Sequence, residues 1–348
     1  MGSKRLNSFD FISGVAILIV ILYHAAQWSK LIDTEVASIL IKSLYFIIPW
    51  FFFKMGYFHN TFYSFNYMIK KTLVNYFIFY LYGILLGLIV FIAKVIYYDY
   101  SIIDEFYKII YKIFRYGDFV YNIPLWFLFS FIFVKIMLFF ISRKHYLIII
   151  CSFLTITLSG FQYYYLPNLD IGSYSSIMPG LSFALVGALT RKYDILNHLA
   201  KFKYPLILTY IIASFLCPSF IRFHYNDLIF GNYWFYFINS ILAIYSLLLI
   251  FKGVKSSSVQ WLGQNSILFF IYHWPLFFVI QFLIRAFNIT SINYIHLILY
   301  FLLSVTFMSI AAFFFKLYDI SKVRWVMRQL YIAFKKYNKR IEKSKVLE

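Results

Sequence analysis

Ten apolar segments follow one another along this chain, and nearly all of them are long enough to cross a bilayer as a helix. A bilayer core of about 30 Å needs roughly 20 apolar residues in a helix. The chain is 63% hydrophobic and only 13% charged, whereas about 25% of the residues of a soluble domain are charged. The pattern predicts an all-α polytopic membrane protein with about ten transmembrane helices. The segments are 9–29, 37–58, 72–95, 124–142, 146–160 (the shortest), 174–190, 204–221, 232–251, 262–286 and 293–315.

The distribution of charge indicates how these spans are oriented. Lys and Arg number 32 against 13 Asp and Glu, a formal charge of +19, which in a soluble protein would indicate nucleic-acid binding. Here most basic residues fall in alternate connections between the spans and after the last span, and most acids fall in the other connections. Because cytoplasmic loops are enriched in Lys and Arg, we expect both termini in the cytoplasm and no nucleic-acid partner.

The same pattern predicts a simple domain organisation. We expect one membrane domain over 1–320 and a basic cytoplasmic tail over 321–348, which anionic lipid would attract. The connection 96–123 is expected outside the cytoplasm, with a short interfacial helix around EFYKIIYKIF. The start of the chain looks like a signal peptide, but further spans follow it, so we interpret it as a retained first span.

Polar side chains inside a span are costly and are therefore candidates for function. In the first segment, Asp10, Ser13, Gly14 and His24 share one helical face, and His24 lies about 21 Å above Asp10 at 1.5 Å per residue. This stripe is suited to lining a passage from the cytoplasmic side to His24. In the alternative interpretation, Asp10 complements the helix dipole and His24 is an interfacial residue.

Several segments resemble the acyltransferase-3 family of integral membrane acyltransferases. The stretch RLNSFDFISGVAILIVILYHA is similar to its first span through Asp10, Gly14 and His24. Four more segments resemble the family in the same order, so the similarity covers nearly the whole chain, and the ordered set is more specific than any single motif. They are IIPWFFFKMGYF, NIPLWFLFSFIF, FALVGALTRK and WLGQNSILFFIYHWPLF, the last through Gly263, Asn265, Ser266, Tyr272, His273 and Pro275.

The resemblance implies transfer of an acyl group, usually acetyl, from cytoplasmic acyl-CoA to a hydroxyl of a sugar or glycan, with no metal. His24 would be the catalytic residue, because a neutral imidazole is suited to taking a proton from a hydroxyl near neutral pH. Asp10 would organise the entrance. A long pantetheine arm would carry the thioester inward to His24. The implied location is the plasma membrane, and the composition hints at a bacterium.

The chain departs from the family where the donor would bind. Ser13 stands in place of a basic residue, and Thr72 and Asn75 stand where arginines are expected. Phosphate recognition needs fixed cations. The cytoplasmic candidates for the CoA phosphates are Lys70, Lys71, Arg191 and Lys192, with Lys54 as a replacement cation. The alternative for Lys54 is a lysine that snorkels to the interface.

Other polar or aromatic residues are candidates for lining the site. His273 precedes Pro275, which frees backbone groups at membrane depth, and it fits a site or a packing role equally. Lys135 is mid-span, where it either faces a cavity or is structural. The full set of predicted lining residues is Ser13, Trp126, Ser266, Tyr272, His273 and Lys135.

Our leading hypothesis is an O-acyltransferase that acts on a cell-surface or lipid-linked glycan of a polysaccharide pathway. Its expected partners are membrane lipid, acyl-CoA, the acceptor, and either a second copy or glycan-assembly machinery. One alternative is a polysaccharide export component with the polar stripe as a conduit. Another is a catalytically degenerate relative, in line with Ser13, Thr72 and Asn75. Transporters often contain internal repeats, and none is visible in the sequence, which favours the enzyme.

Overall fold

The computed structural model describes residues 7–31, 45–61, 64–98, 101–166, 171–216, 220–222, 227–230, 232–287 and 293–317. The described part is helical apart from a short antiparallel pair of strands. Six of its helices are long and apolar enough to cross a membrane: Asn7–Trp28, Phe65–Ile96, His145–Tyr165, Tyr233–Ile250, Ser266–Ala286 and Tyr294–Phe314. The chain is therefore an all-α membrane protein, as predicted. The count of ten spans and the sidedness of the termini stay predictions.

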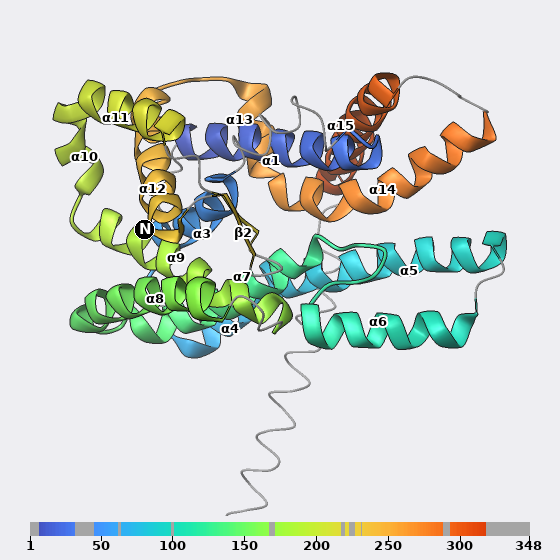
Figure 1. Cartoon of the computed structure of the whole chain (residues 1–348), viewed down its shortest axis with the longest axis horizontal. Coiled ribbons are helices and arrows are strands. Elements are labelled where there is room, and N and C mark those ends of the chain that lie inside the picture. Colours follow the sequence, from blue (N-terminus) through green and yellow to red (C-terminus); the bar gives the residue numbers. More distant parts are fainter. Residues whose placement is uncertain are drawn as a thin grey trace, which may run out of the picture.

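The helices form two groups joined at one end (Figure 1). In the upper group, α1 (Asn7–Trp28) packs against α13 (Ser257–Gln264), α14 (Ser266–Ala286) and α15 (Asn293–Leu317). The lower group holds α4 (Phe65–Thr72), η1 (Leu73–Phe77), α5 (Ile78–Tyr98), α6 (Ile102–Tyr116), α7 (Leu125–Ile141) and α8 (His145–Tyr165). The 3-10 turn η2 (Gly172–Ser176) packs against α6 and α7 in the lower group. The connecting helices are α3 (Ile47–Tyr57), α9 (Ile177–Lys192) and α12 (Tyr233–Ile250), and α3 packs closely along α9.

The remaining elements are two helices, a 3-10 turn and one pair of strands. They are α10 (Ile195–Leu199), η3 (Ala200–Phe202), α11 (Lys203–Leu216), and the strands β1 (Phe220–Arg222) and β2 (Asp227–Phe230). The predicted span 204–221 is wrong at its end, because 220–222 pair with β2 as a strand. The predicted span 37–58 is described only from 45 onward, and the tail 321–348 lies outside the described residues.

Two further predicted spans differ from the structure. The segment 146–160 was the shortest, but α8 runs over 21 residues. The segment 262–286 is divided, because α13 ends at Gln264 and α14 begins at Ser266. Between them, the side chain of Asn265 donates to the carbonyl of Trp261 at 2.8 Å. A side chain that bonds the preceding turn competes with helix continuation, so the break has a local cause.

The helix expected around EFYKIIYKIF is confirmed as α6. The hydroxyl of Ser101 accepts from the N–H of Asp104 at its start, and Gly117, with φ 60°, ends it. Glu105 is buried, and the charged Lys108 and Lys112 fall on the same stripe as Glu105. The opposite stripe is apolar and exposed, and consists of Ile103, Phe106, Tyr107, Ile110 and Phe114.

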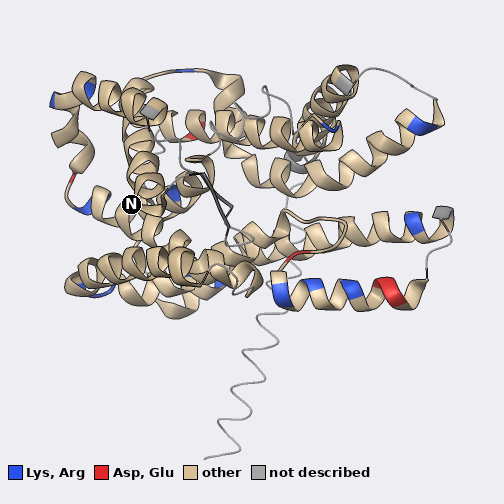
Figure 2. Cartoon of the chain, in the orientation of Figure 1, with Lys and Arg blue, Asp and Glu red and all other residues tan. Residues whose placement is uncertain are grey.

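Pro275 interrupts the hydrogen-bond ladder of α14, and a side chain from another segment repairs the gap. A proline has no N–H to give to the carbonyl four residues earlier, here that of Ile271. The amide nitrogen of Asn122, which is fully buried, donates to the carbonyl of Ile271 at 3.1 Å and to that of Gly83 at 3.0 Å. Asn122 thus joins α14 to α5 at the kink. Figure 2 shows that most of the ribbon is uncharged, with charge concentrated at helix ends and along α6.

Candidate functional site

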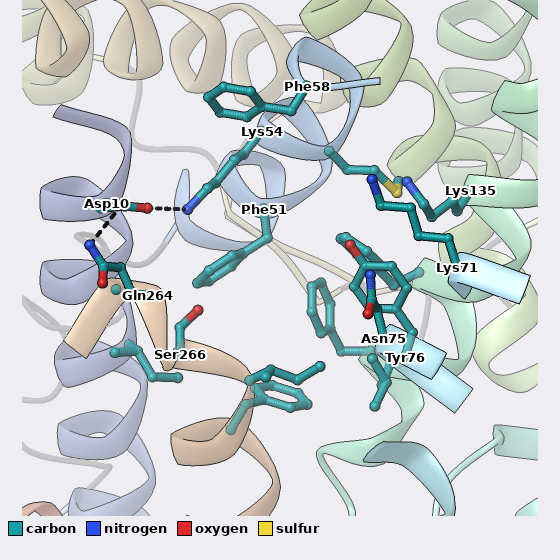
Figure 3. A pocket seen from close by; sticks show the side chains of 18 of the residues that line it. Asp10, Phe51, Lys54, Phe58, Lys71, Asn75, Tyr76, Lys135, Gln264 and Ser266 are labelled. Carbon is teal, nitrogen blue, oxygen red and sulfur yellow. Dashed lines mark hydrogen bonds and ion pairs between the residues drawn. The ribbon is translucent and has the colours of Figure 1, made fainter. Parts of the chain in front are cut away.

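The main cavity of the described structure lies between the two helix groups and has a volume of about 600 Å³. Its walls come from α1, α3, α4, η1, α7, α9, α13 and α14. In Figure 3, Asp10, Gln264 and Ser266 lie on one side of it, and Lys71, Asn75 and Lys135 lie on the other. The lining residues are Asp10, Ile17, Phe51, Lys54, Met55, Phe58, Asn60, Lys71, Asn75, Tyr76, Phe127, Leu128, Phe131, Lys135, Arg191, Gly263, Gln264, Ser266, Ile267 and Phe270.

The charge of this lining is strongly positive. Lys54, Lys71, Lys135 and Arg191 contribute four cations, and Asp10 is the one carboxylate among the described lining residues. The ammonium of Lys135 lies 5.7 Å from the ring centroid of Tyr76, within cation–π range. Cations gathered in a partly buried cavity favour an anionic ligand, because the field is less screened there than in bulk water.

Lys54 is anchored on the first helix. Its ammonium donates to Ser13 Oγ at 2.8 Å and lies 3.4 Å from Asp10 Oδ1. Ser13 Oγ donates its own hydrogen to the carbonyl of Phe9 at 2.8 Å, so its lone pairs are available to Lys54 and to the indole N–H of Trp50 at 3.1 Å. A small hydroxyl at position 13 therefore holds a lysine that another helix supplies.

Asp10 is fixed from two directions. Besides Lys54, the side-chain amide of Gln264 donates to Asp10 Oδ2 at 3.2 Å. This contact depends on a close approach of α1 and α13, which glycines permit: a Cβ on Gly263 would overlap the carbonyl oxygen of Asp10, and one on Gly14 would overlap that of Val259. Small residues let helix backbones approach closely. Gly14 is therefore a packing residue rather than part of an open passage.

A π-helical turn shapes the opposite wall. Residues 73–77 form η1, between α4 and α5. In an α-helix, positions i and i+5 lie on different faces, but the wider π turn brings them together. Lys71, Asn75 and Tyr76 consequently all line the cavity. Single π turns occur frequently at functional sites.

One part of the cavity wall is aromatic. Phe51, Phe127, Phe131 and Phe270 line it, and the rings of Phe127 and Phe270 meet edge to face at 5.1 Å between centroids. The cavity thus has a cationic part and an apolar part, which suits a ligand with a charged end and an uncharged end.

His24 lies outside this cavity, near the other end of α1. Its Nδ1 is 2.7 Å from Gln27 Oε1, and the Gln27 amide nitrogen donates to the hydroxyl of Tyr23 at 3.2 Å. An amide oxygen only accepts hydrogen bonds, so Nδ1 carries the proton of the neutral ring and Nε2 bears the lone pair. Gln27 therefore holds His24 in the tautomer that presents Nε2 as a base.

His273 is stacked on His24, with 5.2 Å between ring centroids. It is fully buried, and its Nδ1 lies 3.1 Å from the carbonyl of Phe269, which only accepts. Nε2 of His273 is buried without a hydrogen-bond partner among the described residues, as is the indole N–H of Trp274. Such groups are uncommon in folded proteins and need an explanation. Two imidazoles with basic Nε2 atoms therefore lie together between α1 and α14.

Phe270 separates the cavity from this histidine pair. It lines the cavity, and its ring centroid lies 5.9 Å from that of His273. On α1, Ile17 lines the cavity while Ile21, one turn closer to His24, is fully buried. The cavity does not extend along the stripe from Asp10 as far as His24, so a passage that reaches His24 stays a prediction.

The positive charges of the cavity wall act on His59, in the connection after α3. Burial first, and then the positive charges of Lys135, Lys71 and Arg191, lower the pKa of His59 from 6.5 to about 4. The guanidinium of Arg191 donates to the carbonyls of Tyr57 and His59 at 3.3 and 3.4 Å. The end of α3 and the residues after it thus hold Arg191 in the cavity wall.

The predicted site residues fall into two groups. The structure brings Asp10, Lys54, Lys71, Arg191, Ser266 and Lys135 together in the cavity wall, with Ser13 directly behind Lys54. The others lie elsewhere: Lys192 contacts His145 Nδ1 at 2.7 Å, Tyr272 bonds the hydroxyl of Tyr82 at 2.7 Å, and His24 and His273 form the stacked pair. Lys70 and Trp126 do not line the cavity.

Sequence reasoning missed three residues that matter. Gln27, three positions after His24, had a visible signal, because residues i and i+3 are neighbours on a helix. Gln264 and Phe270 flank Ser266 in the segment that resembles the family, but which of them faces the cavity depends on the break at Asn265. Within the described ranges, no three His, Cys, Asp or Glu side chains gather as metal ligands would.

Comparisons with known proteins leave the family resemblance as an expectation, because no family model, curated protein or solved structure matches this chain.

Proposed function

We propose that the protein is an integral membrane O-acyltransferase that moves an acyl group, acetyl in the simplest case, from cytoplasmic acyl-CoA to a hydroxyl of a cell-surface or lipid-linked glycan. The observation that carries this proposal is the cavity of about 600 Å³, whose wall contains four cations and a group of phenylalanines. The phosphates of CoA would meet Lys54, Lys71, Lys135 and Arg191. The uncharged pantetheine arm would extend toward Phe270.

The position of the cations supports this assignment of the donor. Lys54, on α3, donates a hydrogen bond to Ser13. A positive charge therefore lies beside position 13, where the resemblance leads us to expect one, although a residue of another helix carries it. The helix ends that hold Lys54, Lys71 and Arg191 are those predicted to be cytoplasmic. This agrees with ten spans, cytoplasmic termini and a location in a bacterial plasma membrane, which remain part of the proposal.

His24 would act as the general base. Its Nε2 takes the proton of the acceptor hydroxyl, whose oxygen attacks the thioester carbonyl carbon, and the carbon–sulfur bond breaks. The CoA thiolate leaves and receives the proton from the imidazolium, so the products are the acyl ester and CoA. Gln27 fixes the tautomer that this role requires. Phe270 has to move for the thioester to meet His24.

Donor binding can be tested without knowing the acceptor. We expect acetyl-CoA to raise the melting temperature of the purified protein in detergent, because a ligand that binds only the folded state stabilises it. Arg191→Met should reduce this rise, and Lys192→Met, at the neighbouring position but outside the cavity, should keep it. A polysaccharide exporter would show no stabilisation by acetyl-CoA in any variant.

Catalysis is tested on the acceptor. Mass analysis of surface glycans from cells that make the wild type should show added acyl groups, and cells that make His24→Gln should lack them. If the wild type adds no acyl mass while acetyl-CoA still stabilises it, the catalytically degenerate alternative holds. If His24→Gln keeps the added mass, His24 is not the base.

A further inference from the structure

A second set of cavities lies along an exposed side of α14, away from the lining of the cationic cavity. One has a volume of about 260 Å³ and the other about 250 Å³. They share Ile89, Val90 and Val279 in their walls, so they form one groove between α5 and α14, which α15 borders. The first cavity is lined by Leu86, Ile89, Val90, Tyr272, Pro275, Leu276, Val279, Phe307, Met308 and Ala311, and the second by Ile89, Val90, Ala93, Lys94, Phe278, Val279, Gln281 and Phe282.

The groove follows the direction of the helices. On α5 its lining runs from Leu86 to Lys94, which is about 12 Å at 1.5 Å per residue. Its deep end is at Tyr272, whose hydroxyl is already bonded to Tyr82 at 2.7 Å. The side of the groove is open, because Ile89 is 64% and Val279 is 49% exposed. A hydrocarbon chain can therefore enter sideways from the bilayer.

Lys94 gives the other end of the groove a positive charge. It is the one charged residue among the described residues that line the groove. Its ammonium lies 4.6 Å from the ring centroid of Phe278 and 5.1 Å from that of Tyr121. Lys94 lies one turn before the end of α5, which is close to headgroup depth if α5 spans the membrane.

The acid that acts on Lys94 is hydrogen-bonded to other residues. Glu105 on α6 lies close enough to influence Lys94, but it accepts from Lys108 at 2.8 Å and from Tyr121 at 2.8 Å. The hydrogen bond from Lys108 is the main cause that lowers the pKa of Glu105. Arg285 is a further cation whose charge acts on Lys94.

We propose that this groove binds the hydrocarbon chain of a single-chain lipid phosphate, of the polyprenyl phosphate type, with its phosphate on Lys94. A single channel fits one chain better than the two chains of a phospholipid, and the cation at headgroup depth is complementary to a phosphate. The proposal rests on the proposed function in one respect: such a lipid would carry the glycan acceptor. α14 connects the two sites, since it bears both the groove and His273, which is stacked on His24.

Native mass spectrometry of the purified full chain in detergent tests the binding, with farnesyl phosphate as the single-chain probe and phosphatidylglycerol as the two-chain probe. We expect farnesyl phosphate to bind more tightly. Lys94→Met, which removes the charge of the groove, should weaken this binding roughly 10-fold, the size expected for losing one charged contact. Val279→Trp, which fills the groove, should weaken it as well. Leu283→Trp, on α14 but outside the groove, and Lys94→Arg should keep it.

Two results would overturn the proposal: equal binding of phosphatidylglycerol, which would indicate ordinary boundary lipid, or unchanged binding of farnesyl phosphate in Lys94→Met and Val279→Trp. Lys94→Met keeps the test valid if the tryptophan variant fails to fold. Stabilisation by acetyl-CoA, measured on the same samples, should be unchanged in both variants. If the wild type binds farnesyl phosphate but acetyl-CoA does not stabilise it, the proposed function fails and the lipid site stands.

Discussion

Lys54 on α3 donates a hydrogen bond to Ser13 on α1 at 2.8 Å, and the same ammonium lies 3.4 Å from Asp10. Asp10 is only 4% exposed and Ser13 is fully buried. Because α1 contains no Lys or Arg, the positive charge beside these two residues comes from Lys54. Two positions that are 41 residues apart thus act as one unit.

This pairing predicts that the lysine can be moved from one helix to the other. Lys54→Met should weaken acetyl-CoA stabilisation by roughly 10-fold or more in apparent affinity, since hydrogen bonds to charged groups contribute about 1.5–3 kcal/mol. Ser13→Lys combined with Lys54→Met should restore much of it. Melting temperature against acetyl-CoA concentration measures both. If the double variant is no better than Lys54→Met, the charge has no role in donor binding.

Protonation of His59 is expected to destabilise the protein in acid. The pKa of His59 is about 4 in the folded state and 6.5 in the unfolded chain, so between these values the unfolded chain binds the proton first. Stability should therefore fall as pH drops from about 6.5 to about 4. His59→Gln should flatten this part of a plot of melting temperature against pH. An unchanged fall in melting temperature between pH 6.5 and pH 4 in His59→Gln would contradict this prediction.

Asn122 is expected to stabilise the kink at Pro275. Asn122→Leu removes both hydrogen bonds of the amide nitrogen and leaves the carbonyl of Ile271 unsatisfied, at a cost of about 1–3 kcal/mol. Pro275→Ala in the same chain supplies an N–H to that carbonyl and should recover part of the loss. Thermal melting of the two single variants and the double variant gives the coupling energy. Additive effects would contradict the contact.

Phe270 is expected to keep water and donor apart from the histidine pair. Phe270→Ala should join the cavity to the space beside His273 and raise the release of free CoA from acetyl-CoA when no acceptor is present, while Phe270→Leu should do so much less. A thiol reagent measures the release. Adding His24→Gln to Phe270→Ala should abolish the increase. An unchanged rate in Phe270→Ala would show that this ring is no barrier.

The sequence predicted the helices well because a bilayer demands long apolar runs, and these are local features. Apolar periodicity could not reveal the break at Asn265, because Asn265 interrupts the helix through one side-chain hydrogen bond. The end of the span 204–221 was missed for a related reason. Phe220 and its neighbours are apolar enough for a membrane helix and equally suited to a strand.

The site was predictable in its residue types and much less in its arrangement. Charges such as Lys135 are conspicuous in an apolar span, so the sequence marks them as candidates. Which of two adjacent basic residues faces the cavity depends on how the helix is rotated about its axis. Lys71 and Arg191 line the cavity, whereas their neighbours Lys70 and Lys192 do not. The docking of Lys54 on Ser13 depends on how α3 lies against α1, and no local pattern encodes that.

The π-helical turn at Leu73–Phe77 links two distant parts of the molecule through the phase of one helix. Lys71 lies before the turn and Lys94 after it, on a continuous helical run from Phe65. An α-helix advances the side-chain direction by about 100° per residue, and the wider π turn advances it by less, so the turn changes the direction of the side chains after it relative to Lys71. The π turn thereby helps to set which side of α5 faces α14.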